Sequence, residues 1–274
     1  MTTIPKLTLN DGHTIPQLGF GTWQVPAGEC ASAVQAALEA GYRHIDTAEM
    51  YDNEHGVGEA VRAAGLAREE VYITSKLANG AHAPDDARRA FEGTLEALGF
   101  DYVDLFLIHW PMPRGRAAFE DTWHTLEELK ADGRARSIGV SNFQVAHLQR
   151  LAAASETLPV VNQIEVHPFH TNEEVRAYGA ENGILTEAWS PLAQGAALTE
   201  PVVTEIAARI GCTPSQVVLR WHVQRGDIVF PKTMSAARMR ENFDVLGPEL
   251  GADDMASIAG LDRGTAGRMG PHPE

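Results

Sequence analysis

Two apolar runs decide the fold: VYITSK at residues 71–76 and VDLFLIH at residues 103–109. Their β-branched and aromatic residues favour strands, and each run ends on a side chain that can carry or share a proton, a lysine in the first and a histidine in the second. An earlier run closes on an acid, and a tyrosine follows it. In a closed parallel barrel, the carboxyl ends of all strands open on one mouth. We therefore expect four side chains to meet at that mouth: Asp46, Tyr51, Lys76 and His109.

Similar β-rich runs recur along the chain and alternate with amphipathic stretches. We expect barrel strands at residues 18–22, 43–47, 71–76, 103–109, 137–141, 160–166, 184–189 and 228–232. Helix signals lie between them, such as the capping-box pattern TPSQ at residues 213–216. Phe119, Trp123 and Leu126 are spaced to share one helix face, which indicates core packing.

This alternation predicts right-handed βαβ units and a single α/β domain over residues 1–274, a (β/α)8 TIM barrel. We expect an N-terminal β-hairpin at residues 6–18, with Asn-Asp-Gly at its turn, and a C-terminal loop over the mouth at residues 264–274. A doubly wound open sheet is the alternative. It is disfavoured because GVG at residues 56–58 lacks the third glycine of a dinucleotide-binding fingerprint, and we expect that segment to be a loop entering a helix.

Composition narrows the classes of partner. The formal net charge is −15, from 22 Lys+Arg against 37 Asp+Glu. A field of that sign repels nucleic acid and anionic membranes, although a local basic pocket can still bind a small anion. Cys30 and Cys212 form no CxxC pair, and the N-terminus has no apolar signal core, so we expect reduced thiols and a cytoplasmic protein. His167 and His170 have no evident third ligand, so no metal site is expected.

The four side chains at the expected mouth can form a proton-delivery set. A free phenol titrates near ~10, and a nearby ammonium such as that of Lys76 would lower the pKa of Tyr51. Asp46 would hold the lysine charged and in place, and His109 would donate a hydrogen bond to a substrate oxygen. Each residue alone could be an ordinary cap, loop aromatic or rim histidine. The apolar runs that precede the lysine and the histidine favour the functional interpretation for the set.

The segment FPKTMSAARMRENF at residues 230–243 predicts an anion site. Ser235 is a natural helix N-cap, and Arg238 follows in the first turn, where the helix dipole already makes the potential positive. Cations are unfavourable there unless an anion arrives, so Lys232, Arg238 and free backbone N–H groups suit a phosphate. A basic surface helix is the alternative, which the acidic composition disfavours.

Polar side chains also end two adjacent strands. Ser141, Asn142 and Gln163 suit a carboxamide ligand, and Trp189 offers a flat aromatic face for a stacked ring. Taken alone this signal is weak, because amides often only satisfy backbone groups and a tryptophan can simply pack at a barrel rim.

Longer motifs carry a family resemblance. They are GYRHIDTAEMYDNEHGVGEAV, ITSKL, DYVDLFLIHWP, SIGVSNF, VNQIEVHP and FPKTM followed by RMRENFDV. In this order the chain strongly resembles the aldo-keto reductase superfamily over nearly its whole length. NDGHTIPQLGFGTWQVP and VVLRWHVQRG are most similar to the bacterial branch that includes 2,5-diketo-D-gluconate reductase. The resemblance implies a monomeric barrel that reduces aldehydes, ketones, dicarbonyls or keto-sugars with NADPH.

The resemblance also implies residue roles at matching motif positions. The catalytic residues would be Asp46, Tyr51, Lys76 and His109, with Tyr51 the general acid. The NADPH-binding residues would be Gly21, Thr22, Trp23, Asp46, Ser141, Asn142, Gln163, Trp189, Ser190, Leu192, Gln194, Lys232, Thr233, Met234, Arg238, Glu241 and Asn242. The substrate would contact Trp23, Met50, Tyr51, Ala78, His109 and Trp110.

One departure from the family pattern bears on specificity. Many relatives carry a tryptophan at the position of Ala78, so we expect a wider, less selective substrate pocket. Two other functions stay open from the sequence. One is a Schiff-base aldolase or lyase that uses Lys76 or Lys232, and the other is a non-catalytic barrel that senses NADPH.

Overall fold

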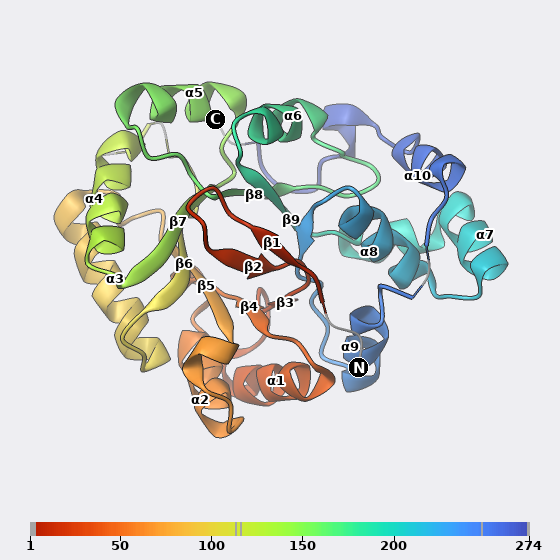
Figure 1. The fold of residues 1–274 in the computed structure, drawn as a ribbon, viewed down its shortest axis with the longest axis horizontal. Helices are drawn as coiled ribbons and strands as arrows, with labels where there is room; N and C mark the ends of the chain where they lie inside the picture. The colour runs from red at the N-terminus through yellow and green to blue at the C-terminus, as the bar shows by residue number, and fades with distance from the viewer. Residues whose placement is uncertain (1–3, 113, 116, 248, 273–274) are drawn as a thin grey trace.

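Eight parallel strands form a closed barrel at the centre of the molecule (Figure 1). The computed structural model describes residues 4–112, 114–115, 117–247 and 249–272. The barrel strands follow one another in chain order: β3 (Phe20–Gly21), β4 (His44–Asp46), β5 (Tyr72–Leu77), β6 (Val103–Ile108), β7 (Ala135–Ser141), β8 (Val161–Glu165), β9 (Leu185–Trp189) and β10 (Ile228–Val229). All eight expected strands are therefore present, with shifted ends.

Backbone hydrogen bonds between the two ends of the sheet close the barrel. Leu18 and Val229 form a parallel bridge. The Gly19 N–H donates to the Val229 oxygen at 2.8 Å, and the Val229 N–H donates to the Gln17 oxygen at 3.0 Å. The open-sheet alternative is therefore wrong. Strands β3 and β10 are only two residues long, shorter than expected, and the residues that pair with Val229 of β10 precede β3 in the chain.

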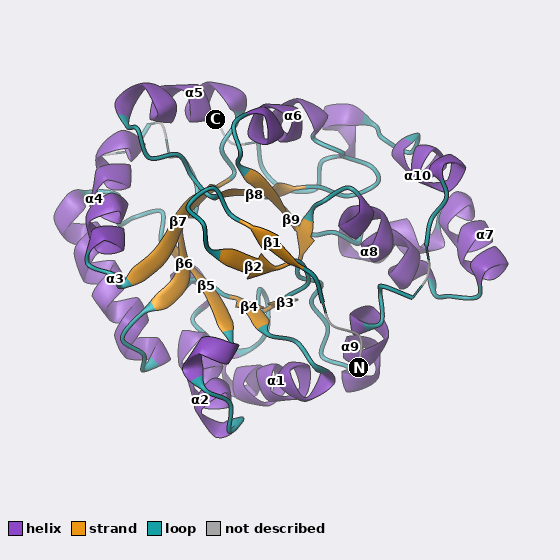
Figure 2. Ribbon diagram, in the orientation of Figure 1, coloured by secondary structure: helices purple, strands orange, loops and turns teal. Residues whose placement is uncertain are grey.

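Helices surround the barrel as an outer layer (Figure 2). In the described chain the α-helices are α1 (Ala27–Ala40), α2 (Glu54–Ala63), α3 (Pro84–Leu98), α4 (Phe119–Ala131), α5 (Val145–Ala154), α6 (Glu173–Glu181), α7 (Pro201–Ile210), α8 (Pro214–Gln224), α9 (Ala236–Phe243) and α10 (Ala252–Ala259). Short 3-10 helices are η1 (Glu49–Tyr51), η2 (Arg68–Glu70), η3 (Ala193–Thr199) and η4 (Gly264–Gly267). None of the helices in the described ranges is both long and apolar enough to cross a membrane.

The N-terminal hairpin covers the amino end of the barrel. Strands β1 (Lys6–Thr8) and β2 (Thr14–Pro16) pair antiparallel as expected, and Figure 1 shows them in front of the barrel opening. Ile15 joins Leu105, Leu107 and other strand residues in an apolar cluster inside this end of the barrel. The amino end is thereby filled, which leaves the carboxyl end as the mouth.

Sequence signals in the outer layer also agree with the structure. Phe119, Trp123 and Leu126 are fully buried, and burial of such side chains contributes roughly 1.5–3 kcal/mol each. The capping box of α8 is present: the Gln216 N–H donates to Thr213 Oγ1 at 3.3 Å, and the Thr213 N–H donates to Gln216 Oε1 at 3.0 Å. The sequence could predict these two features because each depends only on residues that are close together in the chain.

One expectation about residues 56–58 is wrong. The segment does not precede a helix but lies within α2. A Cβ added at Gly56 would sit 2.7 Å from Cys30 Cβ, and one added at Gly58 would sit 1.9 Å from the Leu98 oxygen. These glycines therefore allow α2 to approach α1 and the end of α3. Close helix packing explains both glycines without a ligand.

We predict that Gly58→Ala lowers the free energy of unfolding by about 1–3 kcal/mol, because its methyl group would overlap a backbone carbonyl. Gly93→Ala is the matched control, since nothing lies within 4 Å of its added Cβ and it occupies an exposed position in α3. That control should be neutral or stabilising by up to about 1 kcal/mol. Urea denaturation of both variants checks this, and equal stabilities would contradict it.

Candidate active site

Four side chains expected at the mouth come together there. Asp46 is the last residue of β4, Lys76 is the penultimate residue of β5, and His109 follows β6 directly. Tyr51 ends η1, in the loop after β4. Its hydroxyl lies 3.4 Å from Lys76 Nζ, and its ring meets that of His109 edge to face with centroids 5.7 Å apart. The barrel therefore joins residues that are separated by up to 63 positions in the sequence.

Lys76 is the hub of this cluster and is fully buried. Its ammonium donates to Asp46 Oδ1 at 2.9 Å, to Asp46 Oδ2 at 2.8 Å and to the Thr47 backbone oxygen at 2.8 Å. A buried ammonium is tolerated only when its charge is paired and its hydrogen bonds are satisfied. Burial lowers the pKa of Lys76, but Asp46, Tyr51 and Glu187 together raise it by more, so the pKa lies above its usual value. The lysine is therefore a fixed cation.

The pKa of Tyr51 shows two opposing influences. Burial raises it, and Lys76 lowers it only in part, so the net shift is upward. The ammonium lowers the pKa of this phenol as expected, but the sequence did not predict that burial would outweigh it. The physical reason is that the ring is enclosed by the mouth residues, which disfavours the phenolate. At neutral pH Tyr51 carries its proton and can act as a donor.

His109 is a neutral imidazole in this setting. Burial, followed by repulsion from Lys76, lowers the pKa of His109 to about 3. A neutral ring has one N–H donor and one acceptor nitrogen. The residue can therefore donate a hydrogen bond at the mouth without adding a second positive charge beside Lys76.

The residues expected to bind a carboxamide form one connected network. Ser141 Oγ donates to the Gln163 backbone oxygen at 2.8 Å, and Asn142 Nδ2 donates to Ser141 Oγ at 3.0 Å. Trp189 Nε1 donates to Asn142 Oδ1 at 2.9 Å. Gln163 Nε2 donates to Asp46 Oδ1 at 2.8 Å, which links this network to the Lys76 cluster. The indole and the three polar groups thus lie beside the proton donor.

The other expected cofactor residues lie on two sides of this network. Gly21 and Thr22 are buried where β3 ends, and Thr22 Oγ1 donates to the Asp46 backbone oxygen at 3.1 Å. The next three follow β9: Ser190 and Leu192 lie in the loop, and Gln194 lies in η3. Just before α9, Lys232 and Met234 are exposed and Thr233 is half-buried; within α9, Arg238 is exposed and Glu241 is half-buried. Asn242 differs from these, because its side chain is buried and accepts from Ser215 Oγ at 2.6 Å.

The first turn of α9 matches the expected anion site in its local geometry. Ser235 caps the helix, with its side chain accepting from the Arg238 N–H at 3.4 Å. Arg238 is exposed, so its guanidinium is free to meet a ligand from solvent. The cation at a helix N-terminus remains electrostatically unfavourable without an anion.

Loops at the mouth carry unusual backbone conformations. The non-glycine residues with positive φ in the described chain are Gln24, Asp52, Met112, Asn142, Asn172, Ser190, Ala193 and Gln194. Each follows the carboxyl end of a barrel strand. Such conformations store strain of order 1–3 kcal/mol and concentrate at functional sites. Their clustering distinguishes the mouth from the opposite end.

Large exposed apolar side chains gather in the same loops. Trp23 and Met50 are 47% and 49% exposed, and Trp110 is half-buried. Ala78 directly follows β5, and its N–H donates to Glu49 Oε2 at 3.0 Å, which connects η1 to the end of the strand. Met112 and Met269 are exposed as well. Exposed apolar groups in functional loops suit contact with a substrate.

The C-terminal loop lies over the mouth as expected. The N–H groups of Met269 and Gly270 donate to Glu165 at 2.5 and 3.1 Å, and Glu165 ends β8. A Cβ added at Gly270 would sit 2.4 Å from the Trp189 ring, so the loop packs closely on that indole. Residues 273–274 lie outside the described residues. His167 Nε2 also contacts Glu165, at 3.0 Å, which accounts for one of the two histidines noted in the sequence.

Sequence reasoning missed several residues that organise the mouth. Asn53 Nδ2 donates to the backbone oxygens of Thr22 and Val25, and its side-chain oxygen accepts from Thr47 Oγ1 at 3.0 Å. Glu49 and Met269 were missed as well. The only signal for Asn53 was its place two residues after the tyrosine of the quoted motif, because its partners are distant in sequence.

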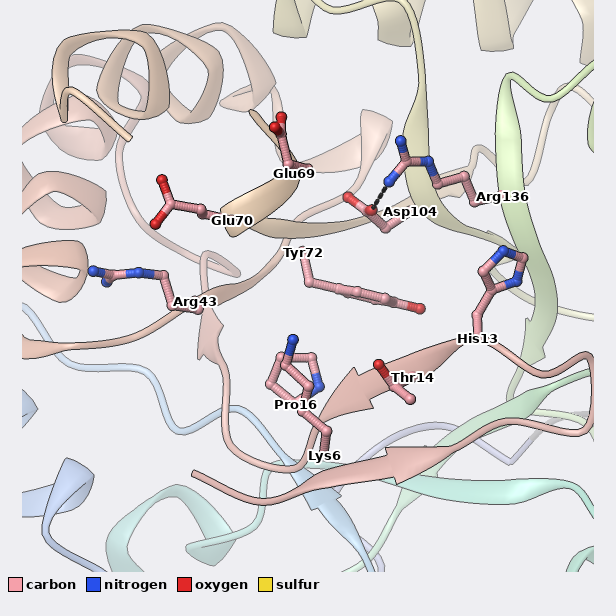
Figure 3. Close-up of a pocket in the computed structure, with 10 residues that line it drawn as sticks. All are labelled: Lys6, His13, Thr14, Pro16, Arg43, Glu69, Glu70, Tyr72, Asp104 and Arg136. Atoms are coloured by element: carbon pink, nitrogen blue, oxygen red, sulfur yellow. Dashed lines mark hydrogen bonds and ion pairs between the residues drawn. The ribbon is translucent and has the colours of Figure 1, made fainter. Parts of the chain in front are cut away.

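A pocket of about 260 Å³ lies at the opposite end of the barrel (Figure 3). Lys6 and Thr14 from the hairpin contribute to it, as do Tyr72 and Asp104 near the starts of their strands. Figure 3 shows the Tyr72 ring lying across this pocket and the ion pair between Asp104 and Arg136 beside it. It contains none of the mouth residues, so it is separate from the candidate active site.

The fold and the mouth define a class of protein: a barrel enzyme that holds a proton donor against a buried lysine–aspartate pair. The model of the family described as Aldo/keto reductase family matches residues 17–263, and the chain belongs to this family.

Similar proteins cover almost the whole chain. An aldo-keto reductase of Mycolicibacterium smegmatis is 49% identical over 269 residues, covering 98% of this chain and 97% of the relative. Methylglyoxal reductase DkgA of Escherichia coli is 44% identical over 270 residues, covering 98% and 96%. A crystal structure of a Gox0644 variant in complex with NADPH has a TM-score of 0.95 at 43% identity, covering 99% of this chain and 98% of that chain. The family expected from the motifs is therefore confirmed.

We predict that His109 makes stability depend on acid pH. The pKa of His109 is about 3 in the folded protein, whereas an unfolded histidine titrates near ~6.5. Protons therefore favour the unfolded chain below pH ~6.5, and stability is lost as the pH falls. Between pH 7 and pH 4.5 the wild type should lose about 2 kcal/mol more than His109→Gln.

Denaturant titrations at both pH values measure this difference. His55→Gln, at an exposed histidine in α2, is the matched control and should keep the wild-type dependence. If His109→Gln and wild type lose the same stability on acidification, the imidazole is not held neutral by its surroundings.

Proposed function

We propose that this protein reduces small carbonyl compounds to alcohols, with NADPH as the hydride donor and Tyr51 as the proton donor. One observation carries the proposal: the Tyr51 hydroxyl lies 3.4 Å from a buried ammonium that is itself fixed by Asp46. A carbonyl oxygen that gains negative charge at this phenol would be stabilised by the nearby cation as the proton is transferred.

The chain's residues would divide the work as follows. Tyr51 holds its proton at neutral pH and would release it to the substrate oxygen, while Lys76 stabilises the phenolate that forms. Asp46 keeps the lysine charged and in place. His109 is neutral and could donate its N–H to the same oxygen, orienting the carbonyl. NADPH, when bound, would supply the hydride.

Residues of the mouth fit a nicotinamide cofactor. Gln163, Ser141 and Asn142 offer donors and acceptors suited to a carboxamide, and the half-buried Trp189 offers a ring face. Away from this network, Lys232 and Arg238 lie near the capped N-terminus of α9, which suits the 2′-phosphate of the cofactor. Solved relatives support this: the Gox0644 variant in complex with NADPH, and an aldo-keto reductase of Bombyx mori in complex with NADP, with a TM-score of 0.91 at 35% identity over 96% of this chain and 94% of that chain.

Small substrates suit the rim of the mouth. Trp23, Met50 and Trp110 supply apolar surface, and the short side chain of Ala78 leaves space where many relatives have an indole. A 44% identical relative is a methylglyoxal reductase, which supports a dicarbonyl such as methylglyoxal as one substrate. Simple aldehydes, ketones and keto-sugars are further candidates. We also infer, from the sequence and its resemblance alone, a monomer that acts in the cytoplasm.

The two alternative functions are less well supported. A Schiff-base enzyme needs a neutral amine, but Lys76 is buried against Asp46 and its pKa is raised, so it would remain charged. Lys232 is exposed, and among the described residues no hydrogen bond or ion pair holds its amine beside a basic group. A non-catalytic NADPH sensor would have no need for a phenol, an imidazole and an ammonium held together at the mouth.

Tyr51→Phe should retain NADPH affinity and lose turnover by about 10²–10⁴-fold, the usual contribution of a general acid. Tyr102→Phe is the matched control, because its ring lies at the amino end of the barrel over Arg68 and Arg136. Stopped-time assays at the nicotinamide absorbance on a carbonyl panel measure turnover, and calorimetry measures binding. Wild-type rates in Tyr51→Phe would rule out the assigned proton donor.

Arg238→Ala should weaken NADPH about 10–100-fold and leave NADH nearly unchanged, because it removes a charge-assisted hydrogen bond to the 2′-phosphate. Arg240→Ala, at another exposed position of α9, is the matched control and should affect both cofactors little. Titrations of each variant with both cofactors check this. Equal loss of NADH and NADPH binding in Arg238→Ala would show that the phosphate site lies elsewhere.

A further inference from the structure

The barrel encloses a carboxyl group that the proposed reaction does not use. Glu187 lies in the middle of β9, in the run ILTEAW, and its exposed fraction is 0%. A fully buried glutamate is rare unless it has a partner. Its partner is Gln163, one of the expected cofactor residues.

Strand register places Glu187 one layer below the mouth. On β8 and β9 the paired residues are Val161 with Leu185, Gln163 with Glu187, and Glu165 with Trp189. Val161 and Leu185 pack in the apolar cluster of the amino end. Alternation along a strand puts all three pairs on the same face, so Glu187 lies between the apolar cluster and Trp189.

The Gln163 amide is held between two carboxyl groups. Gln163 Nε2 donates to Asp46 Oδ1 at 2.8 Å and to Glu187 Oε2 at 2.9 Å. A primary amide has only two N–H donors, so both are committed here. In the opposite amide orientation, the carbonyl oxygen of Gln163 would lie against the ionised Asp46 Oδ1, which has no proton to donate, and the N–H bond to Glu187 Oε2 would be lost. The carboxyl groups thereby select one orientation, with the carbonyl oxygen directed away from them.

Glu187 can accept this bond without adding a second buried anion. Burial, followed by repulsion from Asp46, raises the pKa of Glu187 to about 8. The groups that influence it are Asp46 on β4, Lys76 on β5 and Gln163 on β8. At neutral pH the side chain is therefore mostly protonated, and Asp46 remains the only charged partner of the amide.

We propose that Glu187 is a positioning residue that locks the side-chain amide of Gln163, so that the Gln163 carbonyl oxygen faces the mouth as a hydrogen-bond acceptor for the carboxamide N–H of the nicotinamide. This inference rests on the proposed function, because it specifies how one of the cofactor residues is oriented. Glu187, a residue inside the barrel, would thus make the protein prefer a cofactor whose ring carries a carboxamide.

The test compares NADPH with its reduced 3-acetylpyridine analogue. In this analogue an acetyl group replaces the carboxamide of the nicotinamide, so the ring substituent has no N–H to donate. Calorimetric titration of the cofactor-free protein gives both dissociation constants. The wild type should prefer NADPH by about 10-fold, the value of one hydrogen bond. Glu187→Leu removes one of the two hydrogen bonds that hold the Gln163 amide and leaves only the one to Asp46, so the preference should fall to about 2-fold or less, mainly through weaker NADPH binding.

Three further variants separate orientation from general damage. Glu187→Gln can still present a carbonyl oxygen to Gln163 Nε2 and should restore most of the preference. Glu54→Gln alters another buried carboxyl group, which accepts from Ser75 Oγ outside this network, and should keep the wild-type preference. In a Gln163→Leu background, Glu187→Leu should have no further effect on the ratio. Glu187→Met replaces Glu187→Leu if circular dichroism shows that the leucine variant does not fold.

Specific outcomes overturn the inference. A wild-type preference for NADPH that survives in Glu187→Leu would do so, as would an equal loss of both ligands or an additive effect in the Gln163→Leu background. No preference in the wild type would also exclude the assigned hydrogen bond. If NADPH binds and ketones are reduced in these cases, the proposed function stands and the role of Glu187 alone is wrong. If the wild type binds neither ligand, the proposed function itself is wrong.

Discussion

The charge on Lys76 is the constraint on which the mouth depends. An ammonium that is fully removed from water is stable only with an anion and satisfied hydrogen bonds, and Asp46 and the Thr47 backbone oxygen provide them. The same charge opposes protonation of His109 and offsets part of the burial effect on Tyr51. Burial is the larger influence on both neighbours: the phenol keeps its proton although the ammonium opposes this, and the imidazole stays neutral because burial and the ammonium both lower its pKa.

The closed barrel makes this arrangement possible. Strand pairing places β4 beside β5, so the acid and the lysine at their ends lie in contact. The hairpin and the apolar cluster around Leu105 and Leu107 fill the amino end, which confines the polar layer to the carboxyl end. In the described chain, the pocket at the amino end contains none of the residues that meet Lys76. The apolar packing that stabilises the barrel therefore lies at its amino end, and the polar residues of the candidate active site lie at its carboxyl end.

Loops at the mouth combine strain with exposed apolar surface. Positive φ angles at Gln24 and Asp52 lie in the same loops as the exposed Trp23 and Met50, and those at Asn142 and Ser190 lie in neighbouring loops of the mouth. The strain is offset by hydrogen bonds inside the network, for example that from Trp189 to Asn142. The C-terminal loop adds to this by packing Gly270 on the Trp189 ring. The hydrogen-bonded network inside the mouth suits a cofactor held in one position, and the apolar side chains at its rim suit small substrates of varied shape.

Local sequence determined the strands, the capped helices and the identity of the mouth residues, because apolar runs, caps and the polar residues that close each run are properties of neighbouring positions. The sequence also indicated the anion site at Ser235 and Arg238, whose geometry lies within one helical turn. Tertiary structure alone decided the packing of α2 at Gly56 and Gly58 and the net direction of the Tyr51 pKa shift. It also decided the hydrogen bonds that Asn53 donates to the loop after β3, and the hydrogen bond from Gln163 to Glu187. Each of these depends on atoms from segments that are distant in sequence, and on how far burial outweighs charge once those segments meet.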